Sequence, residues 1–135
     1  MNKESVTEMR LVVTAADYDE ALRFYRDVLG LKERAAYTSP GGHVTILEAG
    51  RATLELTDPN HAAYIDRVEV GRRVAGHIRV AFQVGDSAKL TGTLIDAGAR
   101  LLANPTKTPW NSMNSRLEGP GDLQLTLFTE LDTKP

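Results

Sequence analysis

The alternation of hydrophobic and polar residues divides the chain into two similar series of elements. Residues 9–15 form a short β-branched stretch whose alternate members share one face, which predicts a strand. Asp17 is followed by Glu20, the spacing of a capping box, and apolar residues then recur at helical spacing until Gly30. We therefore predict a strand and an amphipathic helix of about three turns.

The first series continues with residues typical of strands and tight turns. Three strand-like stretches follow the helix, at residues 31–38, 43–49 and 52–57. A Ser-Pro-Gly-Gly turn and Gly50 separate them. Residues 58–76 have weak periodicity and several charges, so we predict a surface connector with a short helix near residues 61–65.

The same order of elements recurs in the second half of the chain. Residues 77–84 predict a strand, and Asp86 caps a helix that Gly98 closes. Three more strand-like stretches follow, at residues 99–103, 113–118 and 123–128.

Landmarks in the two series are separated by a constant offset. Asp86, Gly98 and Arg79 lie 68 or 69 residues after Asp17, Gly30 and Arg10 respectively. A constant offset indicates an internal duplication. We predict one α+β domain over residues 1–135, with βαβββ modules at residues 9–57 and 77–129 whose curled mixed sheet surrounds a cleft, the helices lying outside.

Composition and charge limit the kinds of molecule that the protein is expected to bind. The chain has 135 residues, 41% of them hydrophobic and 25% charged, with a formal net charge of -2 and no cysteine. These values fit one globular domain and exclude disulfides, thiolate zinc sites and a cysteine nucleophile. No basic stripe favours nucleic acid and no long apolar segment favours a membrane, so we expect a cytoplasmic protein that binds neither.

The strand faces turned away from the helices are predicted to carry polar side chains. In a strand that covers a helix with one face, alternate residues point to the other face. These residues are Arg10 and Glu55 in the first copy, and His77, Arg79, Gln124 and Thr126 in the second. Such a polar face predicts a small-molecule site, the alternative being a face that is merely solvated.

Several stretches of the chain resemble the vicinal oxygen chelate superfamily, which includes glyoxalases, bleomycin-resistance proteins and extradiol dioxygenases. They are Arg10-Leu-Val-Val-Thr-Ala-Ala-Asp17, Ala21-Leu-Arg-Phe-Tyr-Arg-Asp-Val-Leu-Gly-Leu31, Ala52-Thr-Leu-Glu-Leu56, and Thr108-Pro-Trp110 before Leu123-Gln-Leu-Thr-Leu-Phe128. The resemblance extends from Met9 to Phe128. It implies a duplicated βαβββ fold, and either a metal-dependent lyase, isomerase or dioxygenase or a protein that sequesters a drug.

The resemblance also implies where a metal would bind. Metal-using members place His or Glu in the first strand and Glu in the last strand of each copy. When the two copies are aligned by their constant offset, the first-strand positions fall on Arg10 and Arg79. The last-strand positions fall on Glu55 and on Thr126 or Gln124. Because guanidinium groups only donate hydrogen bonds, we expect no tightly bound metal and no other cofactor. A two-ligand site of His77 and Glu55 remains an alternative if the register slips.

We therefore predict a metal-free binding protein that captures a small polar, anionic or aromatic molecule. The expected ligand-binding residues are Arg10, Glu55, His77, Arg79, Trp110, Gln124 and Thr126, Trp110 being either an apolar wall or a packing residue. The alternatives are a glyoxalase-type lyase or isomerase with Glu55 as general base, and a scaffold without ligand. The resemblance further implies a homodimer whose chains complete each other's clefts.

Overall fold

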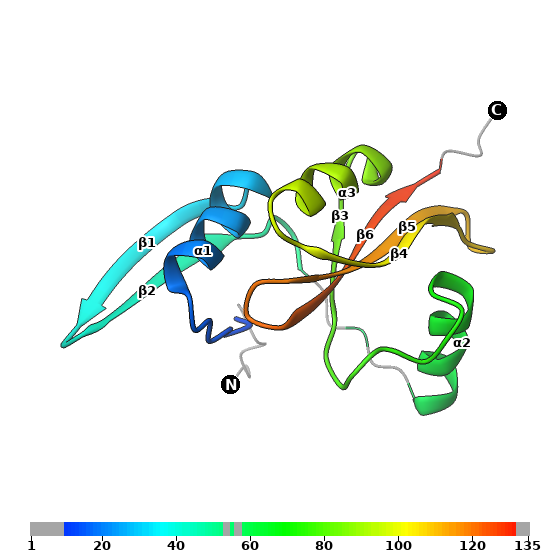
Figure 1. Ribbon diagram of the computed structural model, residues 1–135, viewed down its shortest axis with the longest axis horizontal. Coiled ribbons are helices and arrows are strands. Elements are labelled where there is room, and N and C mark those ends of the chain that lie inside the picture. The colour runs from blue at the N-terminus through cyan, green and yellow to red at the C-terminus, as the bar shows by residue number, and fades with distance from the viewer. Residues whose placement is uncertain (1–9, 53–54, 56–57, 132–135) are drawn as a thin grey trace, which may run out of the picture.

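The computed structural model describes residues 10–52, 55 and 58–131 and shows a mixed α+β fold (Figure 1). Its elements in chain order are α1 (Tyr18–Leu22), the π-helical turn η1 (Arg23–Val28), β1 (Lys32–Ser39), β2 (Gly42–Glu48), α2 (Pro59–Glu69), β3 (Val80–Gln83), α3 (Ser87–Asp96), β4 (Arg100–Lys107), β5 (Ser112–Gly119) and β6 (Leu123–Glu130). No helix in the described ranges is long and apolar enough to cross a membrane.

The second half forms a four-stranded sheet with the order β3-β6-β5-β4. β3 runs parallel to β6, and the other neighbours are antiparallel. The apolar core lies between this sheet and α3, where Leu94 meets Leu117, Leu125 and Leu127, all fully buried. The second half therefore contains a strand, a helix and three strands in this order.

Both predicted helix starts and both helix-ending glycines have the expected geometry. Asp17 accepts a hydrogen bond from the Glu20 amide at 3.0 Å, and Asp86 accepts one from the Lys89 amide at 3.0 Å. Gly30 and Gly98 have φ values of 93° and 111°, the left-handed conformation that ends many helices. The capping residues thus mark equivalent points in the two halves.

The first half differs from the predicted module. Residues 10–15 are irregular, so the strand predicted at residues 9–15 is wrong for its described part. Among the described residues, β1 and β2 pair only with each other. The described strands form two sheets, where we predicted one curled sheet. The predicted strand at residues 52–57 lies mostly outside the described residues.

A strand needs a neighbour for its backbone hydrogen bonds, and the apolar residues near the N-terminus instead contact the turn between β5 and β6. A side chain at Gly121 would meet Val13 Cγ1 at 2.8 Å. Tyr25 donates its hydroxyl hydrogen to the carbonyl of Pro120 at 2.7 Å. The first half is therefore docked on this turn through side chains.

The connector contains the largest departure from the predicted layout. Its helix α2 has 11 residues and begins at Pro59, and the carboxylate of the N-cap residue Asp58 accepts from the His61 amide at 2.8 Å. α2 covers part of the sheet face opposite α3 (Figure 1). The expectation that all helices lie outside is therefore correct for α3 and wrong for α2.

Candidate functional site

The sheet face under α2 is polar and buried. Period-two alternation places Arg116 and Asn114 of β5, with Gln124 and Thr126 of β6, opposite the leucines that face α3. These four residues are between 0% and 8% exposed. The polar face predicted for the last strand is thus confirmed, but it is covered by a helix where we expected an open cleft.

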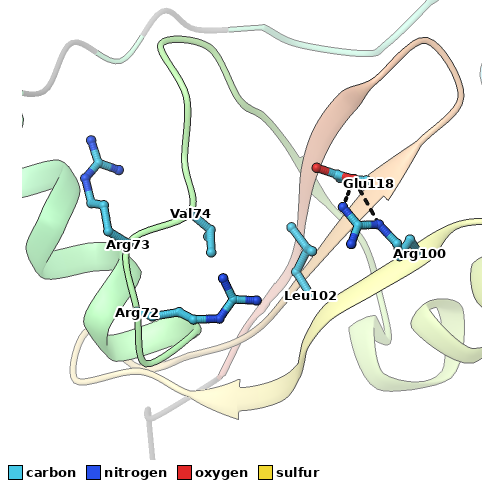
Figure 2. Close-up of a pocket in the computed structure, with 6 residues that line it drawn as sticks. All are labelled: Arg72, Arg73, Val74, Arg100, Leu102 and Glu118. Carbon is cyan, nitrogen blue, oxygen red and sulfur yellow. Dashed lines mark hydrogen bonds and ion pairs between the residues drawn. The ribbon is translucent and has the colours of Figure 1, made fainter.

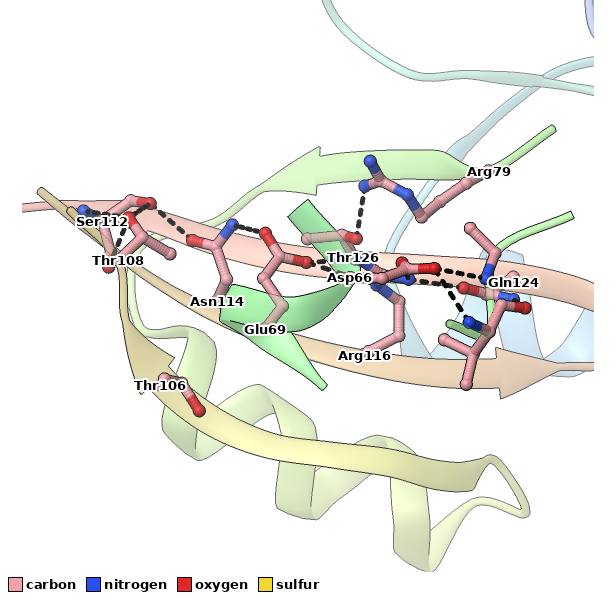
Figure 3. A network of polar contacts seen from close by, with 12 residues as sticks. Asp66, Glu69, Arg79, Thr106, Thr108, Ser112, Asn114, Arg116, Gln124 and Thr126 are labelled. Atoms are coloured by element: carbon pink, nitrogen blue, oxygen red, sulfur yellow. Dashed lines mark hydrogen bonds and ion pairs between the residues drawn. The ribbon is translucent and has the colours of Figure 1, made fainter. Parts of the chain in front are cut away.

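Arg116 is the centre of this polar face and is fully buried. Its Nη1 donates to Asp66 Oδ1 at 2.9 Å, and its Nη2 donates to Glu69 Oε1 at 2.7 Å. Nη1 also donates to Gln124 Oε1 at 2.7 Å. A buried guanidinium is stable only with such partners, and here two carboxylates from α2 supply the opposite charge (Figure 3).

Asp66 joins the sheet to the turn that follows α2. Its Oδ2 accepts from Arg73 Nη1 at 2.7 Å and from the amides of Val74 and Ala75 at 2.8 and 2.9 Å. Burial by itself would raise the pKa of Asp66, but the two amides and two guanidinium groups outweigh burial and lower that pKa. Asp66 is therefore an ionised structural residue.

A chain of hydrogen bonds extends from Glu69 towards the turn between β4 and β5. Asn114 Nδ2 donates to Glu69 Oε2 at 2.6 Å, and Ser112 Oγ donates to Asn114 Oδ1 at 2.6 Å. Thr108 Oγ1 lies 2.8 Å from Ser112 Oγ. Every buried side-chain polar atom among the described residues has a partner, so this network is complete.

Arg79 lies beside the network, just before β3, and is half-buried. Its Nη1 donates to Thr126 Oγ1 at 2.6 Å (Figure 3). Burial and the positive charge of Arg116 lower the pKa of Arg79, while the carboxylates of Glu69, Asp66 and Glu55 act in the opposite direction. The lowering effects prevail, and burial is the largest of them.

The structure brings together three of the predicted site residues, Arg79, Gln124 and Thr126. Glu55 is exposed, and its charge acts on Arg79. Arg10 and His77 are exposed, and Trp110 is 45% exposed with its ring centroid 6.2 Å from that of Tyr64. The charge network predicted for Arg10, Glu55 and Arg79 stays a prediction.

The sequence analysis did not predict the buried centre of this polar face. Arg116, Asp66 and Glu69 were not among the predicted site residues, although a signal for Arg116 is present. Polar residues alternate along β5 at Ser112, Asn114, Arg116 and Glu118, which is the pattern of a polar strand face. The carboxylates on α2 carried no such signal, because their partners are about 50 residues away in sequence.

The residues at the metal positions of the wider family do not fit a divalent cation. Thr126 Oγ1 accepts from Arg79, and Gln124 Oε1 accepts from Arg116, so guanidinium groups occupy the neighbourhood of both candidate ligands. Within the described part of the chain, no group of three His, Asp or Glu side chains is arranged to hold an ion. We derive no chemistry through a metal from these residues.

The chain belongs to the Glyoxalase/Bleomycin resistance protein/Dioxygenase superfamily, whose model matches residues 9–127. The predicted family and α+β fold class are thereby confirmed. A search of curated proteins finds no match.

Solved structures with this fold are distant in sequence. A glyoxalase family protein from Bacillus cereus has a TM-score of 0.60 and 16% identity, with 98% of this chain and 99% of that chain covered. A hypothetical protein from S. aureus has a TM-score of 0.62 and 13% identity, covering 93% and 95%. A glyoxalase-related enzyme from Fulvimarina pelagi has a TM-score of 0.56 and 17% identity, covering 93% and 89%. At these identities the likeness shows the fold alone.

Proposed function

We propose that the protein binds a small polar, anionic or aromatic molecule without a metal, beside Arg79 at the margin of the buried polar face. The observation that carries this proposal is the state of Arg79. Its guanidinium is half-buried, and its pKa is lowered by burial and by Arg116. An anion placed beside it would supply an opposite charge to this partly desolvated guanidinium.

The groups around Arg79 favour a ligand that accepts hydrogen bonds. Thr126 and Gln124 already accept hydrogen bonds from arginines, which leaves few acceptors to hold a cation. Guanidinium groups match carboxylate and phosphate oxygens with paired hydrogen bonds. Negatively charged ligands are therefore expected to bind more tightly than neutral ones of the same size.

An aromatic portion of a ligand would need a separate apolar surface. Tyr64, in the middle of α2, and Trp110 are 37% and 45% exposed, and their rings lie close together, which makes them candidates for that surface. Trp110→Ala should weaken the binding of an aromatic acid more than the binding of an aliphatic acid.

The alternative function is a lyase or isomerase of glyoxalase type with Glu55 as general base. Its support is electrostatic, because the Glu55 carboxylate acts on Arg79, and an arginine beside a base can stabilise a developing enolate. Glu55→Gln distinguishes the two functions. An enzyme would lose turnover, whereas a binding protein would keep or gain affinity for an anion.

The binding proposal is tested by a thermal-shift screen of small acids, aromatic antibiotics and thiol adducts, followed by calorimetry on each hit. Arg79→Ala should weaken an anionic hit by about 1.5 to 3 kcal/mol, the range for a charge-assisted hydrogen bond. Lys89→Ala, on the far helix α3, removes one positive charge as a control. Unchanged affinity in Arg79→Ala for every hit would refute the proposal, as would one equivalent of tightly bound metal.

We also propose a homodimer, because several exposed apolar side chains lie on the first half and before β3. Val12, Ile78, Tyr37 and Val44 are 83%, 63%, 61% and 48% exposed. A two-stranded sheet such as β1-β2 is marginal in water unless another surface covers it. Light scattering at micromolar concentration should give the mass of two chains, and Val12→Asp should lower it. A mass of one chain for the parent protein would contradict the dimer.

A further inference from the structure

A separate cavity of about 240 Å³ lies at the edge of the polar face, beyond the end of α2 (Figure 2). The turn after α2 forms one wall, and the β4-β5 pair forms the other. The lining residues are Arg72, Arg73, Val74, Arg100, Leu102 and Glu118. The cavity is smaller than the roughly 300–1,000 Å³ of drug-sized pockets, so it suits a ligand of few atoms.

The wall after α2 is held in place before any ligand arrives. The amides of Val70 and Gly71 donate to the Asp66 carbonyl at 2.7 and 2.9 Å, and Gly71 has a φ of 88° that ends the helix. The amide of Val74 donates to the Asp66 carboxylate at 2.8 Å, and the carbonyl of Val74 accepts from Gln124 Nε2 at 3.2 Å. Arg72 lies between these fixed points, so its backbone needs little ordering on binding.

The charges around the cavity leave an excess of about one positive charge. Arg73 is paired with Asp66 at 2.7 Å, and Arg100 is paired with Glu118. Among the described residues, Arg72 has no carboxylate partner, and Figure 2 shows its guanidinium directed across the cavity towards Leu102 and Arg100. Arg100 uses Nε and Nη2 on Glu118, so Nη1 can donate to a ligand.

We propose that this cavity binds a small anion, through a carboxylate or phosphate group held between Arg72 and Arg100. Two guanidinium groups from different elements would approach the same oxygens, which is the arrangement that favours such anions. Val74 and Leu102 supply the apolar part of the lining, so a short aliphatic group on the anion would be accommodated. Arg79 is not among the lining residues, so this site is distinct from the ligand site proposed above.

The test is a titration of the whole protein with inorganic phosphate and, separately, with isobutyrate, followed by the amide NMR signals of Val74 and Leu102. We expect saturable shifts of these signals with at least one probe, and the stronger probe identifies the preferred group. Arg72→Ala should weaken that binding by about tenfold, and Arg72→Gln serves as a second variant that keeps side-chain length. Glu118→Gln should strengthen it, because the carboxylate repels the anion.

Two control variants separate this site from general charge effects and from the site at Arg79. Lys89→Ala also removes one positive charge, but on the opposite face of the sheet, and Arg79→Ala removes the neighbouring cation. In both variants the affinity reported by the Val74 and Leu102 signals should stay within about twofold of that of the parent protein, even where Arg79→Ala weakens binding at its own site. Absence of shifts with both probes, or equal weakening by Arg72→Ala and Lys89→Ala, would overturn the proposal.

Discussion

The two faces of the β3-β6-β5-β4 sheet hold their helices by different physical means. On one face, α3 buries Leu94 against three leucines of β5 and β6. On the other, the buried residues of α2 are Ile65, Asp66 and Glu69, and both carboxylates bind Arg116. α3 is held by apolar burial around Leu94 together with neutral hydrogen bonds from Ser87 and Thr91 to β5, whereas α2 is held by a network of buried charges.

We therefore expect α2 and α3 to respond to different perturbations. Apolar burial tolerates changes of pH and depends on packing, whereas a buried ion network depends on every member being present and ionised. The following predictions separate these two kinds of attachment.

Removing the centre of the ion network should have the largest effect. Arg116→Ala leaves the carboxylates of Asp66 and Glu69 buried without their counter-ion, so the free energy of unfolding should fall by about 3 to 5 kcal/mol. Urea unfolding measures this loss. Arg100→Ala is the matched control, since its ion pair with Glu118 is largely exposed and should contribute at most about 1 kcal/mol. Equal losses in the two variants would contradict the comparison.

The apolar face should respond to truncation of Leu94. Leu94→Ala creates a cavity among fully buried leucines, and we expect a loss of about 2 to 5 kcal/mol in the free energy of unfolding. Ile95→Ala, at a side chain that is 37% exposed, should cost clearly less. The Leu94→Ala loss should be the same at pH 7 and pH 4. A strong pH dependence of that loss would show that the two faces are not independent.

Acid should weaken the polar face selectively. The pKa of Asp66 is lowered in the folded protein, so the unfolded chain binds the proton more readily. Its contribution to stability is complete well above the unfolded pKa of about 3.9 and is lost as pH falls towards the folded pKa. Between pH 5 and pH 3, the amides of α2 should gain hydrogen exchange before those of α3.

Asp66→Asn is the variant that tests this assignment. Its unfolding free energy should be lower than that of the parent protein at pH 7 and should depend less on pH below 5. If parent and variant show the same pH dependence in urea unfolding, Asp66 is not the group responsible.

The smallest expected effects come from the helix caps. Asp58→Ala and Asp86→Ala each remove the acceptor for an amide at the start of α2 or α3, at a cost of about 1 kcal/mol. Serine at either position should restore most of the loss. Because α2 has less apolar attachment, Asp58→Ala should increase exchange in its own helix more than Asp86→Ala does in α3. The reverse order would argue against the comparison.

Local signals in the sequence predicted most of the second half and the helix ends of the first. The caps at Asp17 and Asp86, the left-handed glycines at Gly30 and Gly98, and the alternation along β6 all have the expected geometry. Each depends on residues within a few positions of one another.

Predictions that depended on distant partners were less successful. The stretch from residue 10 to 15 has the composition of a strand but contacts a turn through side chains, as Val13 does at Gly121. Strand formation needs a second strand at the right distance, and composition does not state whether one is available. The contact between α2 and the sheet was missed for the same reason.

The sequence by itself determined the family, the fold class, the helix caps and the polar character of one strand face. Only the tertiary structure decided that α2 covers this face, that Arg116 is its centre, and that Arg72 and Arg79 lie at its margins. Hydrophobic periodicity and capping act over a few residues, and can be recognised in a linear chain. A buried ion network joins residues about 50 positions apart, and exists only where folding excludes water around them.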